Sequence, residues 1–296
     1  MSVRPATGIE LYSAVAQDAS AAVISRYSTS FGLASRLLGN RVRCHVRNVY
    51  ALVRVADEIV DGPALAAGLS PDQARAVLDA LETDTLAAIA AGFSANLVVH
   101  AFALTARECG IDERLVRPFF ASMREDLTTR SHDEASHDTY VYGSAEVVGL
   151  MCLQAFVNAA SDAPSDPPAH LVHGARRLGA AFQDVNFLRD QAFDAESLGR
   201  DYLGSGDRTR VLDRIDADLA VAAVAISDLP ADCRRAVTAA HGLFAELSTR
   251  LRRAPADAPR VRVPDPVKAL IALRAALGFP PRGPRSAAHA PSAAPA

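Results

Sequence analysis

The chain has 296 residues, 50% of them hydrophobic and 22% charged, with a formal net charge of −3. This composition supports a sizeable core and excludes an intrinsically disordered chain. The small negative charge, together with the lack of a basic stripe interleaved with aromatic residues, excludes nucleic acid as an expected partner.

The distribution of apolar residues and cysteines bears on the location of the protein. No stretch approaches the roughly 18 to 20 consecutive apolar residues that a membrane span needs, and the N-terminal segment has no uninterrupted apolar core typical of a secretory signal. The four cysteines are widely scattered and form no CxxC pair, as expected for buried free thiols in a reducing compartment. We expect a cytoplasmic protein with at most peripheral membrane contact; the pattern leaves the oligomeric state open.

Helical periodicity dominates the chain, and alternating strand-like runs between hairpin turns are scarce. The helix starts carry recognisable signals, such as the N-cap Ser70 followed by Pro71. We expect one all-α domain over residues 1–280 and a disordered Pro/Ala-rich tail over residues 281–296. In chain order, the expected helices cover residues 9–25, 42–61, 71–91, 95–108, 112–127, 139–160, 166–195, 207–226, 231–252 and 265–277.

The second expected helix contains the apolar stretch YALVRVADEIVDG, which begins at Tyr50 and carries several carboxylates. Asp57 and Asp61 are four residues apart and so share a helix face, where two unpaired carboxylates repel each other. A divalent cation such as Mg²⁺, which prefers oxygen ligands, removes this conflict. Arg54 lies on the same face as Asp57, whereas Glu58 is turned about 100° away and is not an expected ligand. Such a pair alone is more often a solvated face.

A second acidic face changes this balance. The expected helix 166–195 is also apolar, and Arg189 on it could neutralise phosphate. Two such faces could bracket two or three Mg²⁺ ions that hold a diphosphate, with Mn²⁺ as a substitute metal. An apolar bundle core would then hold a hydrocarbon chain and protect a carbocation from water. The second face carries four polar side chains at spacings of three, four and four: Gln183, Asn186, Asp190 and Asp194.

Together, these motifs resemble the squalene/phytoene synthases, the head-to-head prenyl diphosphate synthases. The resemblance covers roughly residues 10–280, and its motifs occur in the family's order. It implies an isoprenoid-synthase-type helical bundle with a central cavity. The matching segments are RYSTSFGLASRLL, YALVRVADEIVDG, MREDLTTR with its Asp126, YVYGSAEVVGLM, QDVNFLRDQAFD, GRDYLG and RVRVPDPVK.

The resemblance also implies roles for individual residues. Those implied as catalytic are Tyr140, Asp57, Asp61, Asp190 and Arg54. Those implied as substrate-binding are Ser28, Ser30, Tyr50, Arg54, Gln183, Arg189, Arg200 and Tyr202. Those implied as metal ligands are Asp57, Asp61, Asn186, Asp190 and Asp194.

Simpler interpretations stay open for several of these residues. Arg54 and Arg189 could be salt-bridge partners of nearby carboxylates, Gln183 a packing amide, and each tyrosine a core residue with a satisfied hydroxyl. Arg200 could be a solvated loop residue. Three phenylalanines could line a chain tunnel or fill the core: Phe31, Phe182 and Phe187. Two histidines are expected in a polar helix end and loop: His132 and His137.

Several positions depart from the family pattern, among them Gly204, where proline is usual, and Phe244, near a position that carries tyrosine in some relatives. Three more concern the expected site. Thr29 stands where a basic residue is frequent, so a phosphate-binding charge is missing or supplied elsewhere. Glu58 replaces an aspartate. In the GSAE segment, Glu146 stands where glycine is common, so close helix packing or the polarity of the site is expected to differ.

By resemblance, the expected reaction joins two geranylgeranyl diphosphates through a cyclopropyl (prephytoene) diphosphate to phytoene, in carotenoid biosynthesis. NADPH is not expected, because proton loss ends phytoene synthesis. The alternative is a farnesyl diphosphate enzyme that makes squalene, dehydrosqualene or presqualene diphosphate. A non-enzymatic assembly protein is less favoured, because loss of the carboxylates is its expected signature and both acidic faces are present.

Overall fold

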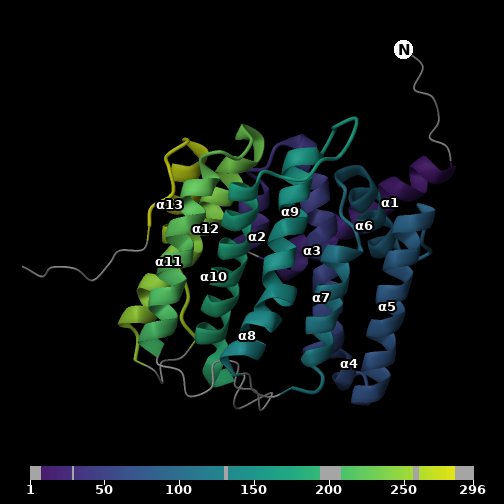
Figure 1. The fold of residues 1–296 in the computed structure, drawn as a ribbon, viewed down its shortest axis with the longest axis horizontal. Coiled ribbons are helices and arrows are strands. Elements are labelled where there is room, and N and C mark those ends of the chain that lie inside the picture. Colours follow the sequence, from purple (N-terminus) through teal and green to yellow (C-terminus); the bar gives the residue numbers. More distant parts are fainter. Residues whose placement is uncertain (1–7, 29, 130–132, 194–207, 256–259, 284–296) are drawn as a thin grey trace, which may run out of the picture.

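The computed structural model describes residues 8–28, 30–129, 133–193, 208–255 and 260–283. Every regular element in these ranges is a helix, and the long helices run side by side as a bundle (Figure 1). The predicted all-α fold is confirmed. The helices are α1 (Gly8–Tyr27), α2 (Ser30–Ser35), α3 (Asn40–Val60), α4 (Pro63–Ala66), α5 (Pro71–Ala91), α6 (Leu97–Cys109), α7 (Glu113–Glu125), α8 (Glu134–Val141), the π-helix η1 (Tyr142–Glu146), α9 (Val147–Asn158), α10 (Ala169–Phe193), α11 (Arg208–Ile226), α12 (Ala231–Arg253) and α13 (Asp265–Ala276).

Local sequence signals account for many helix ends. The Ser70 hydroxyl accepts a hydrogen bond from the backbone N–H of Gln73, whose side chain in turn accepts one from the backbone N–H of Ser70, so α5 begins with a complete capping box. Gly92 ends the same helix in the left-handed conformation that glycine adopts without steric cost. These signals act within one turn, so the helix ends that they mark can be recognised in the sequence without knowledge of tertiary contacts.

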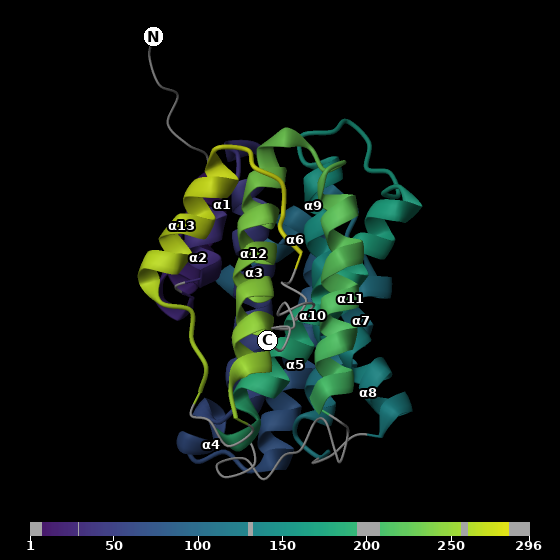
Figure 2. The ribbon, with the colours of Figure 1, turned by 90° about the vertical axis from the view of Figure 1, so that its left-hand side faces the viewer.

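The bundle has three large apolar clusters. One joins α3, α5, α6, α7 and α9 around Phe102 and Phe119. A second joins α9 to α10, α11 and α12 around Phe156 and Leu171. A third joins α10, α11 and α12 around Ile215. In the view of Figure 2, α12 lies in front of α3, and α13 lies in front of α1 and α2. Residues of all three clusters contribute to the walls of the candidate site.

The structure differs from the expected helix at residues 139–160. The helical path starts earlier, with α8, and passes through η1 before α9. The close approach of neighbouring helices explains the wide turn: a Cβ at Gly143 would overlap the Ser122 hydroxyl, and one at Gly179 would lie 2.7 Å from the carbonyl oxygen of Ala145. His137, expected in a polar helix end and loop, lies within α8 and is buried, so the expected polar surroundings were wrong.

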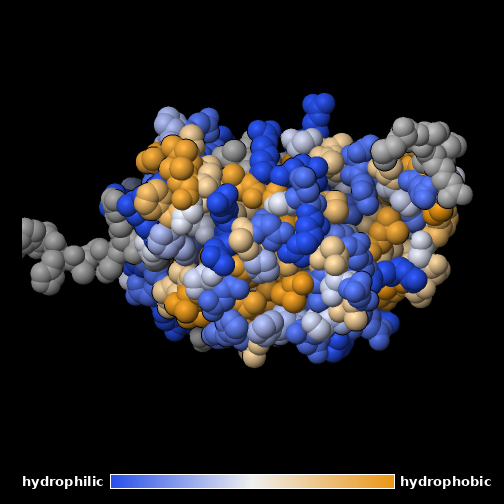
Figure 3. Space-filling view, turned by 90° about the horizontal axis from the view of Figure 1, so that it is seen from above, coloured by the Kyte–Doolittle hydropathy of each residue, from blue (hydrophilic) through white to orange (hydrophobic). Residues whose placement is uncertain are grey.

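The surface combines hydrophilic side chains with separate apolar patches, as the face in Figure 3 illustrates. The largest exposed apolar side chains of α13 and the segment after it include Leu270, Leu273, Leu277 and Phe279. Within the described ranges, one helical path, Ala135–Asn158, is long and apolar enough to cross a membrane, and half of its apolar window is buried inside the bundle. This burial is typical of a core helix in a bundle.

Candidate active site

A cavity of about 720 Å³ lies in the centre of the bundle. The lining residues from the first halves of α3 and α10 are apolar, whereas the charged and amide lining residues of these two helices come from their second halves or directly follow α3. The cavity therefore has a polar end and an apolar end, as a ligand with a charged head and a hydrocarbon chain requires. Its apolar wall includes Leu38, Val46, Leu153, Phe156, Leu171 and Leu229.

The first acidic face lies at the polar end. Asp57 and Asp61 both line the cavity, and the backbone N–H of Asp61 donates to the carbonyl oxygen of Asp57 at 2.8 Å as α3 ends. Burial raises the pKa of the Asp57 carboxyl well above its usual range, and the nearby Asp61 charge raises it further. Desolvation and repulsion both disfavour the charged form of this carboxylate, and a bound cation would stabilise that form.

Arg54 is both a salt-bridge partner and a cavity residue, the two roles that the sequence left open. Its guanidinium forms an ion pair with Glu58 one turn along α3, and it lies 4.6 Å from the centre of the Tyr27 ring. Arg54 also lines the cavity, so its positive charge reaches the polar end while Glu58 holds it in place. Burial raises the pKa of the Tyr50 hydroxyl, which lines the cavity and hydrogen-bonds Ser28.

The second acidic face lies on α10. Gln183, Asn186 and Asp190 line the same cavity as the first face. Two guanidinium groups bind the Asp190 carboxylate: Arg189 Nη2 lies 2.6 Å from Oδ2, and Arg260 Nε lies 2.7 Å from Oδ1. Arg189 is thus both a salt-bridge partner and a cavity residue.

Sequence reasoning missed Arg260 as a site residue. It lies before α13 in the RVRVPDPVK segment, which already matched the family, and the structure brings it to the cavity wall. The only available signal was a basic residue inside a matched segment. Its pairing with Asp190 links positions 70 residues apart, so local spacing could not reveal it.

Tyr140 and Asp126 form a buried pair in the cavity wall. The Tyr140 hydroxyl lies 2.8 Å from Oδ1 and 3.0 Å from Oδ2 of Asp126, to which it donates. The Ser122 hydroxyl donates to the Tyr140 carbonyl oxygen at 3.1 Å, and the Phe187 ring lies 5.9 Å from the Tyr140 ring. The hydroxyl of Tyr140 therefore holds a fixed position beside a carboxylate, inside the wall that Phe182 and Phe187 also line.

The oxygen-bearing side chains that line the polar end fit a magnesium ion. Carboxylate and amide oxygens are the ligands that Mg²⁺ accepts, and burial and the Asp61 charge raise the pKa of Asp57 although Arg54 lies nearby, so further positive charge is favoured here. Among the described residues, however, no three His, Cys, Asp or Glu side chains group closely enough to hold an ion by themselves. An ion here would complete its ligand set with oxygens from a bound substrate, as is typical of Mg²⁺. The fitting side chains are Asp57, Asp61, Asn186 and Asp190.

Several expected site residues lie outside the described residues. These are Asp194, Arg200 and Tyr202, together with Thr29 of the N-terminal motif. Ser30 begins α2, but its side chain, like that of Phe31, is outside the described part. The departure at Glu146 does have a structural account. Its carboxylate is buried and paired with Arg176 at 2.6 Å and with Arg177 at 3.1 Å.

Known proteins resemble this chain in both sequence and fold. The 15-cis-phytoene synthase of Paracoccus sp. is 29% identical over 276 residues, which cover 84% of this chain and 86% of the relative. Phytoene synthase 3 of Zea mays is 33% identical over a match that covers 67% of this chain and 44% of the relative. The phytoene synthase of Cereibacter sphaeroides is 34% identical over a match that covers 63% of this chain and 51% of the relative. The chain thus spans about half of these two relatives.

Solved structures share the fold at low sequence identity. A dehydrosqualene synthase superimposes with a TM-score of 0.74 at 20% identity, covering 90% of this chain and 96% of that one. A squalene synthase from Alicyclobacillus acidocaldarius superimposes with a TM-score of 0.69 at 18% identity, covering 82% of this chain and 95% of that one. The sequence pattern of the squalene/phytoene synthases matches residues 24–207. The chain therefore belongs to the squalene/phytoene synthase family, whose members are prenyltransferases.

Proposed function

We propose that this prenyltransferase condenses two geranylgeranyl diphosphates head to head to phytoene, in a reaction that depends on Mg²⁺. The observation that carries the proposal is the meeting of two acidic helix faces at one end of a cavity whose other end is apolar. The phytoene synthases among its relatives support the twenty-carbon substrate. The alternative is a farnesyl diphosphate enzyme with squalene, dehydrosqualene or presqualene diphosphate as its product.

The polar end would bind the diphosphate groups. Arg54, Arg189 and Arg260 bring three guanidinium groups to the cavity wall, and guanidinium groups match phosphate oxygens in charge and geometry. Asp57, Asp61, Asn186 and Asp190 would hold Mg²⁺, or Mn²⁺ in its place, with Asp194 as a fifth proposed ligand. A bound metal would neutralise the diphosphate and stabilise it as a leaving group. Proposed substrate contacts also include Ser28, Ser30, Tyr50, Gln183, Arg200 and Tyr202.

The apolar end would hold the prenyl chains and exclude water. In the first half-reaction, the C–O bond of the donor breaks and its allylic cation is captured by the acceptor's double bond; loss of a proton then gives the cyclopropyl diphosphate. Tyr140, whose hydroxyl is fixed against Asp126, is the proposed participant in this step. In the second half-reaction, the remaining diphosphate leaves, the cation rearranges and a proton is lost. Because no hydride is consumed, NADPH is not required.

The greasy substrates and product are consistent with an intracellular enzyme that contacts membranes peripherally. We propose that residues 1–280 form its catalytic domain. An assembly protein without activity would not need the two carboxylate faces and the cavity with an apolar end that this chain combines, so the enzyme is favoured.

Release of inorganic diphosphate tests this proposal. Purified protein with Mg²⁺ and geranylgeranyl diphosphate should release diphosphate, and chelation should stop it. Asp57→Asn and Asp190→Asn should each lower the rate by about 100-fold or more, because each removes a proposed ligand charge. Asp213→Asn is the matched control. It changes an exposed carboxylate of α11 that pairs with Arg252 of α12, and its rate should stay near that of the wild type. Near-normal release by both site variants would overturn the assignment.

A further inference from the structure

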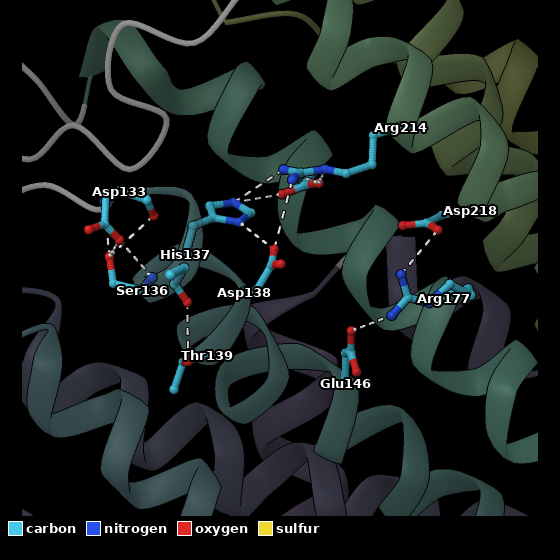
Figure 4. Close-up of polar contacts among 11 residues, drawn as sticks. Asp133, Ser136, His137, Asp138, Thr139, Glu146, Arg177, Arg214 and Asp218 are labelled. Carbon is cyan, nitrogen blue, oxygen red and sulfur yellow. Dashed lines mark hydrogen bonds and ion pairs between the residues drawn. The ribbon is translucent and has the colours of Figure 1, made fainter.

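A buried ionic cluster lies behind the cavity wall, outside the proposed site. His137 Nε2 on α8 lies 3.0 Å from Oδ1 of Asp184 on α10, and Arg214 of α11 binds the other carboxylate oxygen, with Nη2 2.9 Å from Oδ2 (Figure 4). The cluster therefore joins three helices. A second carboxylate, Asp138 of α8, also belongs to it: its Oδ1 lies 3.5 Å from His137 Nδ1 and 3.9 Å from Arg214 Nη1.

The carboxylate at the centre of this cluster is almost fully buried. The Asp184 side chain is only 2% exposed, and that of His137 is 7% exposed. Asp184 is turned about 200° along α10 from Asn186, so it points away from the proposed metal face. Burying an ion pair costs desolvation free energy that an apolar trio would not, so stability alone does not explain the cluster. Fixing the position of a helix does explain it.

The helix that the cluster fixes is the one that carries Tyr140. His137 lies one turn before Tyr140 on α8. The His137 ring packs edge-on against Phe187 with ring centres 5.9 Å apart, and Phe187 packs against Tyr140 at the same separation. A continuous series of contacts therefore runs from Asp184 through His137 and Phe187 to Tyr140.

A second ionic contact holds the chain on the other side of Tyr140. Glu146, at the end of η1, pairs with Arg177 of α10 at 3.1 Å, and Arg177 also pairs with Asp218 of α11 at 3.4 Å (Figure 4). Tyr140 thus lies between two ionic contacts that bind its segment to α10 and α11. The hydroxyl of Tyr140 can then keep its place beside Asp126 only as long as that segment stays in register.

We propose that His137, held by Asp184 and Arg214, is a positioning residue that fixes Tyr140 against Asp126 in the cavity wall. The inference rests on the proposed function, because it assigns His137 an effect on the reaction through Tyr140. A displacement of about 1 Å far from the reacting atoms can cost about 100-fold in rate, so a small loss of register has a measurable effect.

Two substitutions separate the polar contact from the shape of the ring. His137→Phe keeps the packing against Phe187 and removes the 3.0 Å polar contact with Asp184. His137→Gln keeps a polar group that can face Asp184. His137→Phe should lower kcat by about 10-fold with a smaller change in KM. His137→Gln should have a kcat close to that of the wild type. Thr139→Ala, on an exposed position of the same helix, is the matched control. Equal losses in the Phe and Gln variants would contradict the proposal.

A double-mutant cycle tests whether His137 acts through Tyr140. In a Tyr140→Phe background, His137→Phe should change kcat by less than about twofold, because the group that it positions is already gone. A purely structural role would instead give the same loss in both backgrounds and would overturn the proposal.

A fluorine NMR measurement decides the point without activity. The chain has six tyrosines, so protein made with 3-fluorotyrosine should give a small set of resonances, and Tyr140→Phe identifies the one from Tyr140. That resonance should shift in His137→Phe and return towards its wild-type position in His137→Gln. If it does not move in a folded His137→Phe protein, the positioning role is wrong. If it moves while wild-type protein makes no product, the proposed function fails and the positioning contact stands.

Discussion

Asp57 is an acidic side chain in surroundings that disfavour its charge, because burial and the neighbouring Asp61 both raise the pKa of its carboxyl. The folded protein therefore binds this proton more tightly than the unfolded chain, so ionisation of Asp57 lowers the stability of the metal-free protein as pH rises above the usual pKa of an aspartate. The conflict is the physical reason to expect a cation at this face.

Asp57→Asn removes that charge while keeping the shape of the side chain. We predict that it raises the thermal midpoint of the metal-free protein at pH 7 and that this advantage shrinks as pH falls below the usual range of an aspartate. Turnover should be lost at the same time. Thermal unfolding in chelator across a pH series measures the effect, and a midpoint below wild type at pH 7 would show that the carboxylate is already compensated.

Arg260 connects the segment before α13 to the acidic face of α10 through Asp190. We predict that Arg260→Ala raises KM for the prenyl diphosphate by about 10-fold, because a charge-assisted contact to phosphate is lost. The thermal midpoint should change little, since the side chain is 53% exposed. Arg262→Ala, two residues further along, is the control. Steady-state kinetics would contradict the assignment if both variants had the same KM.

Residues separated by one or two helical turns could be predicted from the sequence. Asp57 with Asp61, and Asn186 with Asp190, share faces that the helical period alone defines, and the structure brings both faces to one cavity. The Tyr140–Asp126 hydrogen bond and the approach of Arg260 could not be predicted, because they depend on how distant helices pack. His137 was placed wrongly, because a polar stretch hides one histidine that tertiary packing buries.

At the scale of helices, the starts of α3 and α12 are joined by a charged contact. Arg41 Nε lies 2.8 Å from Asp232 Oδ2, and the Gly39 backbone N–H donates to the carbonyl oxygen of Asp232 at 2.7 Å. Arg41 also donates to the carbonyl oxygens of Phe156 and Ala159, both at 2.9 Å, near the end of α9. One arginine therefore ties three helix ends together.

The hydrogen bond from Arg41 is the largest cause of the lowered pKa of the Asp232 carboxyl. A lowered pKa stabilises the fold at pH values above the unfolded-state pKa, and this stabilisation is lost as pH falls through the folded-state pKa, which lies below the usual pKa of an aspartate. We predict that Asp232→Asn lowers the free energy of unfolding by about 1 kcal/mol at pH 7, a modest value because the pair is partly exposed. Urea unfolding at pH 7 and below pH 3 should show the difference shrinking; a constant difference would contradict the account.

The wide turn at η1 depends on the absence of a side chain at Gly143, where a Cβ would overlap both the Ser122 hydroxyl and the Pro118 carbonyl oxygen of α7. We predict that Gly143→Ala lowers the free energy of unfolding by about 2 kcal/mol or more, because the backbone of α7 cannot yield easily. Gly283→Ala, with open space around it, should have little effect. Chemical denaturation of the two variants measures the contrast, and equal midpoints would show that the turn can adjust.

Helix ends and helix irregularities differ in how well sequence predicts them. The capping box at Ser70 and the left-handed Gly92 act within a turn, so the expected bounds of α5 agree with the structure. The short helices α2 and α4 and the π-helix η1 were not expected. The π-helix depends on close contacts of Gly143 with α7, which no local pattern encodes.

At the scale of the whole molecule, three apolar clusters of the bundle surround a cavity of about 720 Å³. Composition and helical period were enough to predict an all-α fold, and the order of the motifs was enough to predict the family. The length of the cavity depends on which side chains meet at its apolar end, among them Phe156 and Leu229, and these come from helices far apart in sequence. Substrate chain length therefore needs a direct measurement.

The central claim is the head-to-head condensation of two twenty-carbon diphosphates without reduction. The direct test incubates purified protein and Mg²⁺ with geranylgeranyl or farnesyl diphosphate, with and without NADPH, and identifies the extracted hydrocarbon by mass spectrometry. We predict phytoene from geranylgeranyl diphosphate, in equal amounts with and without NADPH. A product from farnesyl diphosphate alone would contradict the substrate assignment, and no hydrocarbon from either substrate, with folded protein and metal present, would contradict the proposed function.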